Sequence, residues 1–85
     1  MPPLDHRGNT LRTYIRKHGI ALAPRELREL QATFDQAWRH RKPGADTAEL
    51  RDGLAQEIVR QRQRGVRDPK RLTALAIAWI TARNG

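Results

Sequence analysis

The sequence contains neither cysteine nor serine. Without cysteine there can be no disulfide framework and no thiolate metal site, and the usual hydroxyl and thiol nucleophiles are missing. The three histidines, His6, His18 and His40, are too far apart for a short metal-ligand spacing. No pair of carboxylates and no glycine-rich phosphate loop stands out either. We therefore predict a protein that is not an enzyme and that uses no metal, no cofactor and no small-molecule substrate.

Long apolar runs are also missing. The longest stretch without a charge is LTALAIAWITA at residues 72–82, about half of the roughly 20 apolar residues that a membrane span needs. The first residues, MPPLDHRGN, lack the apolar region of a secretory signal. We expect no membrane partner and a cytoplasmic location.

Aromatic residues make up only 5% of the chain. Phe34, Trp38 and Trp79 fall at positions that continue apolar helix faces, which predicts a place in the core. Tyr14 is the only ambiguous aromatic residue. A single-strand binding surface built from stacking platforms is therefore disfavoured.

Negative charge is scarce as well, since 17 Lys and Arg residues stand against 9 Asp and Glu residues, a net charge of +8. Fourteen of the 17 cations are arginine. Such a balance favours a polyanionic partner, meaning nucleic acid, an anionic membrane surface or an acidic protein. Two plainer readings compete with this one: the charge keeps a small protein soluble, and the arginine bias reflects the base composition of the genome.

Helix start and stop signals divide the sequence into four parts. Gly19, the Pro43-Gly44 pair and Gly65 are typical of helix ends, whereas Pro24 and Pro69 suit the first position of a helix. A capping box at residues 46–49, with Asp46 as the cap, begins the third helix. We predict an all-α four-helix bundle of one short and three longer helices, at residues 10–18, 24–42, 47–64 and 69–82. Residues 1–9 are predicted to form a flexible N-terminal arm, and residues 10–85 a single helical domain.

The apolar residues of the first three predicted helices each recur on one face. The last helix differs, because it is apolar nearly all round, which is typical of a helix at the centre of a fold. Its second side carries Thr73, Ile77 and Thr81. Either the monomer covers this side too, or it is an interface for a protein partner or a second copy of the chain.

The densest basic stretch, RQRQRGVRDPKR at residues 60–71, lies directly before this apolar helix. Lys70 and Arg71 fall in the first turn of the last helix, where the helix dipole disfavours cations. Positive charge is thus concentrated at a position where it lowers the stability of the helix, which indicates an anion-binding surface. The alternative is that these cations are ordinary solvated surface residues. The residues predicted to contact nucleic acid are Arg60, Arg64, Arg67, Lys70 and Arg71, with Arg12, Arg16 and Lys17 as a second patch.

The turn at residues 65–68 has the length and the glycine of a helix-turn-helix turn. The region of residues 15–22 is a second candidate and fits somewhat better, because the helix after it begins with Arg25 and Arg28 and has a polar outer face. The helix after the first candidate is uncharged from Leu72 onward, and both matches are weak. We therefore expect contacts to phosphates rather than reading of bases. The sequence predicts a small basic binding module, a nucleic-acid-binding accessory or regulatory protein working on DNA or RNA. The alternative is a protein-protein interaction module, an adaptor or antagonist that is possibly homodimeric.

Overall fold

The computed structural model describes residues 6–44 and 47–84. These residues form four α-helices and their connections, with no strand among them: α1 (His6–Lys17), α2 (Pro24–Trp38), α3 (Ala48–Gln63) and α4 (Pro69–Asn84). α1 has 12 residues and the others have 15 or 16. The predicted all-α bundle of one short and three longer helices is confirmed.

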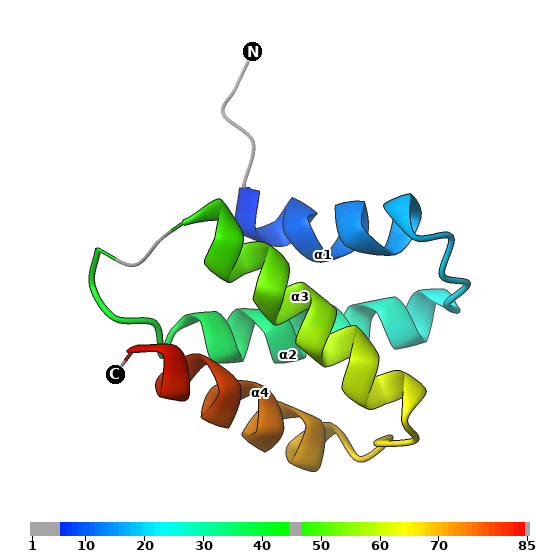
Figure 1. The fold of residues 1–85 in the computed structure, drawn as a ribbon. Helices are drawn as coiled ribbons and strands as arrows, with labels where there is room; N and C mark the ends of the chain where they lie inside the picture. The colour runs from blue at the N-terminus through cyan, green and yellow to red at the C-terminus, as the bar shows by residue number, and fades with distance from the viewer. Residues whose placement is uncertain (1–5, 45–46, 85) are drawn as a thin grey trace.

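The helices alternate in direction (Figure 1). α1 and α3 run one way, and α2 and α4 run back. α4 packs on α2 and α3, and its interface with α2 is the most extensive in the bundle, in agreement with the central role predicted for the C-terminal helix. α1 packs against α2 and α3 and, within the described ranges, makes no helix-packing contact with α4.

Two of the predicted helix ends are built as expected around glycine. Gly19 and Gly65 have φ angles of 64° and 106°, in the region that side chains with a Cβ rarely adopt. The following residue closes each end: the Ile20 N–H donates to the Ile15 carbonyl at 3.0 Å, and the Val66 N–H donates to the Gln61 carbonyl at 3.1 Å. Both closing residues are partly buried against the core, which is the hydrophobic contact that accompanies this type of helix end.

The predicted helix starts are correct for α2 and α4 and shifted by one residue for α3. Pro24 and Pro69 occupy the first positions, and Asp68 caps α4 by accepting the Lys70 N–H at 3.1 Å. The N-cap of α3 is Thr47, whose Oγ1 accepts the Leu50 N–H at 3.1 Å. The prediction of Asp46 as the cap was wrong; Asp46 itself lies outside the described residues.

Two helix boundaries differ from the prediction by four residues each, and the ends of α1, α3 and α4 differ by one or two residues. α1 begins at His6, four residues before Thr10. Once the later part of the helix is packed in the core, backbone hydrogen bonds extend the helix toward the N-terminus, and this extension needs no apolar pattern in the sequence. Of the predicted arm at residues 1–9, residues 1–5 lie outside the described residues. α2 ends at Trp38 and not at Lys42, because Pro43 disfavours helical geometry at the residue before it.

The core confirms that the apolar residues of α1, α2 and α3 each gather on one face. In α4 one row of residues, spaced one helical turn apart, is buried, and the rows of residues on either side of it are half-buried. Outside them runs a strip of small exposed residues, Ala74, Ala78 and Thr81. The buried apolar residues are Leu11, Ile15, Leu30, Phe34, Ala37, Trp38, Leu54, Ala55, Ile58, Val59, Leu72, Ala76 and Ile80.

The predicted partner interface on α4 is only partly available. Thr73 is half-buried, and its hydroxyl lies 3.3 Å from that of the buried Thr33 of α2. Ile77 is also half-buried and packs against the core, so that of the three predicted interface residues only Thr81 is exposed. Among the described helices, none has the length and apolar character needed to cross a membrane.

Candidate nucleic-acid interface

One end of the bundle gathers positive charge from two separate stretches of the chain, residues 16–17 and 64–71. The C-terminal ends of α1 and α3 and the N-terminal ends of α2 and α4 all lie there, on the right in Figure 1. The α1–α2 connection meets the C-terminal end of α3 across a cleft of about 460 Å³, which His18, Arg62 and Arg67 help to line. The term "basic end" is used below for the exposed cations Arg16, Lys17, Arg64, Arg67, Lys70 and Arg71.

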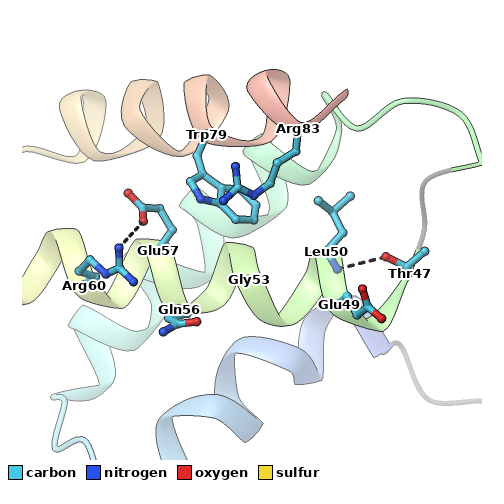
Figure 2. A pocket seen from close by; sticks show the side chains of 9 residues that line it. All are labelled: Thr47, Glu49, Leu50, Gly53, Gln56, Glu57, Arg60, Trp79 and Arg83. Carbon is cyan, nitrogen blue, oxygen red and sulfur yellow. Dashed lines mark hydrogen bonds and ion pairs between the residues drawn. The ribbon is translucent and has the colours of Figure 1, made fainter. Parts of the chain in front are cut away.

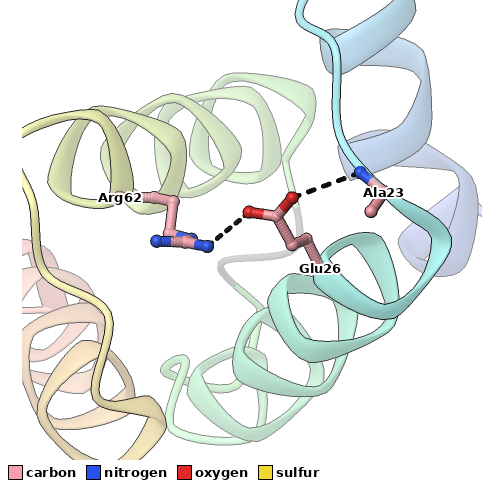
Figure 3. Close-up of polar contacts among 3 residues, drawn as sticks. All are labelled: Ala23, Glu26 and Arg62. Atoms are coloured by element: carbon pink, nitrogen blue, oxygen red, sulfur yellow. Dashed lines mark hydrogen bonds and ion pairs between the residues drawn. The ribbon is translucent and has the colours of Figure 1, made fainter.

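An ion pair between Glu26 and Arg62 holds this end together (Figure 3). Only 33% of the Glu26 side chain and 13% of the Arg62 side chain are exposed. The second Glu26 oxygen accepts the Ala23 N–H at 3.3 Å. The same carboxylate therefore satisfies a backbone donor at the start of α2 and holds α3 against α2. The two residues are 36 positions apart, and no sequence signal links them.

Most of the predicted phosphate-binding residues lie at the basic end. Arg16 and Lys17 are in the last turn of α1, and Arg64 is the C-cap of α3. Arg67 is in the next connection, and Lys70 and Arg71 are in the first turn of α4. The two patches predicted from distant parts of the sequence are therefore brought to the same end of the molecule.

Arg12 and Arg60 are placed differently. Arg12 is exposed on α1, one turn before Arg16. Arg60 is exposed on α3, but it lines a different hollow, between α3 and α4, and lies 3.6 Å from the Glu57 carboxylate. Neither residue lines the cleft beside Arg67.

The helix dipoles favour the positions of some cations of the basic end and oppose the positions of others. Cations in the last turns of α1 and α3 complement the negative ends of these helix dipoles. Lys70 and Arg71 stand at the positive end of α4, where the dipole opposes them. The nearby Asp68 offsets them only in part, since its Oδ1 accepts a backbone N–H. Their position therefore costs stability.

A second hollow of about 420 Å³ lies between α3 and α4 (Figure 2). Trp79 projects into it from α4, and the guanidinium carbon of Arg83 lies 4.1 Å from the centroid of the Trp79 ring. Sequence reasoning placed Trp79 in the core; the ring does pack against the core, but it is half-buried and lines this hollow. We call this site the Trp79 groove; its lining residues are Thr47, Glu49, Leu50, Gly53, Gln56, Glu57, Arg60, Trp79 and Arg83.

Within residues 6–44 and 47–84 no three metal-binding side chains come together. The fold and its charged end define a small, basic, all-α four-helix bundle. Comparison of the chain with known protein families, with curated proteins and with solved structures found no match. The function is therefore argued from the geometry of the basic end and the Trp79 groove.

Proposed function

We propose that the protein is a non-enzymatic nucleic-acid-binding accessory or regulatory protein that contacts phosphates through the basic end. The observation that supports this proposal is the convergence of two basic patches that are some 50 residues apart in the sequence. A row of phosphates is the partner that matches several exposed cations on one surface, because each neutralised phosphate releases a counterion.

The position of Lys70 and Arg71 favours this function over a merely solvated surface. A cation needed only for solubility can lie anywhere on the surface, and the start of a helix is the least favourable place for it. Pro69 has no N–H and Asp68 accepts the N–H groups of Lys70 and Leu72, so the Lys70 and Arg71 side chains are the groups that would bind a phosphate here. Cations at this point are explained by an anion that approaches the start of α4.

Contacts to phosphates, rather than reading of base edges, suit the shape of α4. Between Arg71 and Arg83 the exposed residues of this helix are small and uncharged, among them Ala74, Ala78 and Thr81. Base recognition in the major groove needs long hydrogen-bonding side chains such as Arg, Asn or Gln. The exposed face of α4 has no such side chain between its first turn and Arg83 in its last turn.

The test is a fluorescence-anisotropy titration of labelled duplex DNA and duplex RNA at several salt concentrations. Arg67→Gln/Arg71→Gln is compared with Arg39→Gln/Lys42→Gln, which removes the same charge from exposed residues that follow α2 at the other end of the bundle. We expect the first variant to lower the slope of log K against log salt by about 2, one for each lost phosphate contact. The second variant should change the slope much less.

Two results would contradict the proposal. Wild-type binding no tighter than about 10⁻⁴ M at physiological salt is the weak limit of non-specific affinity and would make the charge a solubility feature. Equal losses in the two double variants would mean that total charge matters and that the basic end does not.

Protein-protein interaction is the second candidate function. The exposed strip Ala74, Ala78 and Thr81 on α4 favours it, because an uncharged surface is unusual in a chain of which 31% is charged. The strip lacks the large aromatic or arginine anchors that carry most binding energy at interfaces. Phosphate binding therefore ranks first.

A further inference from the structure

The Trp79 groove combines three features that together suit an unpaired nucleobase. Its centre is an aromatic ring that is only half-buried. The guanidinium of Arg83 lies over that ring at 4.1 Å, and Arg60 lines the same hollow (Figure 2). Aromatic rings and guanidinium planes are the two kinds of side chain on which single-stranded bases stack.

The groove approaches the proposed phosphate surface along α3, because Arg60 at one end of its lining is followed by Arg64 of the basic end. Arg60 lies one turn before Arg64 on α3, and both side chains are exposed. A strand whose phosphates follow the basic end can therefore place its next nucleotide beside Arg60 at the mouth of the groove.

Carboxylates in the groove do not prevent this arrangement. Glu57 lies 3.6 Å from Arg60, with 13% of its side chain exposed against 56% for Arg60. The Glu57 carboxylate also accepts the Gln61 side-chain N–H at 2.7 Å, so it keeps a hydrogen-bond partner when Arg60 turns outward. A phosphate can replace Glu57 as the partner of Arg60. Glu49 is on the first turn of α3, one turn from Gly53 and three turns from Arg60, so it lies nearer the uncharged base than the phosphate that Arg60 would bind.

We infer that the Trp79 groove holds one unpaired base of a single-stranded nucleic acid. The base stacks on the Trp79–Arg83 pair, and Arg60 binds the adjoining phosphate. This inference rests on the proposed function and sharpens it: the preferred ligand is single-stranded, since the bases of a duplex are already stacked and paired. It also revises the expectation, drawn from the few aromatic residues, that a single-strand binding surface built from stacking platforms is disfavoured.

The experiment compares a labelled dT12 oligonucleotide with a 12-base-pair duplex at one salt concentration, using anisotropy and tryptophan fluorescence. The variants are Trp79→Leu and Arg83→Gln, with Arg39→Gln as the control that removes one exposed cation elsewhere. We expect dT12 to quench wild-type fluorescence through Trp79, because Trp38 is buried. Trp79→Leu should abolish the quenching and weaken dT12 binding about tenfold, with duplex affinity unchanged. Arg83→Gln should weaken dT12 binding more than Arg39→Gln does.

The outcomes separate this inference from the proposed function. If the wild-type protein binds duplex and dT12, while Trp79→Leu binds dT12 like the wild type and Arg83→Gln binds it like Arg39→Gln, the groove inference is wrong and the phosphate surface stands. If the wild-type protein binds neither ligand, both proposals are wrong. Circular dichroism checks the fold of each variant; should Trp79→Leu fail to fold, the comparison of Arg83→Gln with Arg39→Gln decides.

Discussion

Gly53 of α3 leaves the space that the edge of the Trp79 ring of α4 fills. A Cβ atom at position 53 would lie 2.8 Å from Cη2 and 3.1 Å from Cζ2 of that ring, closer than side chains normally approach. A glycine inside a helix costs about 1 kcal/mol relative to alanine. This cost is offset by the close contact between α3 and α4 that it permits.

Gly53→Ala should therefore not stabilise the protein. The gain in helix propensity of about 1 kcal/mol is cancelled or exceeded by an overpacking cost of about 1–3 kcal/mol. Urea denaturation measures the free energy of unfolding, and the emission of Trp79 should shift to the red as the ring is pushed outward. Gln56→Gly, at an exposed position of α3, should lower stability by about 1 kcal/mol. This loss is the reference value for the helix propensity of glycine in α3. A gain of about 1 kcal/mol in Gly53→Ala with unchanged emission would show that the two groups do not pack.

Glu26→Gln should lower the free energy of unfolding by about 1.5–3 kcal/mol, the usual contribution of a hydrogen bond to a charged group. The amide can still accept the Ala23 N–H, but it leaves the mostly buried Arg62 guanidinium without a counter-charge. Thermal and urea unfolding measure the loss. Glu29→Gln, an exposed neighbour on α2, should change stability by no more than about 0.5 kcal/mol. Equal effects of the two substitutions would mean that the ion pair does not hold α3 to α2.

Thr73→Val should cost about 1–3 kcal/mol, because it leaves the buried Thr33 hydroxyl without its partner on α4. Thr33→Val/Thr73→Val replaces both hydroxyls by methyl groups of similar shape and should be less destabilised than Thr73→Val alone. Urea denaturation of both single variants and the double variant completes the cycle. Additive losses would show that the two hydroxyls are not coupled.

Local chemistry explains which parts of the fold the sequence predicts. Gly19, Pro24, Gly65 and Pro69 mark helix ends through backbone geometry that depends on the residue itself, and all four predictions are confirmed. The start of α1 at His6 was missed because a helix extends beyond its last packed residue with no apolar signal. Glycine and proline thus predict where a helix begins or ends, and tertiary packing determines how far a helix extends where no such residue is present.

Tertiary contacts explain what the sequence could not predict about the site. Helical periodicity assigned Trp79 to an apolar face, and the ring does face α3, but only the packing distance at Gly53 shows that it also lines a hollow. The Glu26–Arg62 pair depends on two helices crossing at their ends. Individual cations of the basic end were predicted, whereas their convergence follows from the alternating directions of the helices.

Self-association through α4 is best probed at Ala78. The half-buried Ile77 packs against the core, and a charge there would unfold the monomer as well as disrupt an interface. We expect the wild-type protein to be monomeric, since a stable interface buries about 800 Å² per partner and a strip of alanine and threonine supplies little of that. Light scattering over a hundredfold range of concentration measures the mass. A mass that rises with concentration, and that Ala78→Glu returns to the monomer value, would favour the interaction module instead.

Arg16→Gln/Lys17→Gln tests whether the two basic patches form one surface. If a single nucleic acid contacts both, this variant should lower the salt slope by about 2, as Arg67→Gln/Arg71→Gln does, and the quadruple variant by about 4. Arg39→Gln/Lys42→Gln is again the control of equal charge. The same anisotropy titration measures all four variants. An unchanged slope in Arg16→Gln/Lys17→Gln would mean that the ligand contacts only the α3–α4 side of the basic end. The positive charge of α1 would then be explained by its favourable position at the end of that helix.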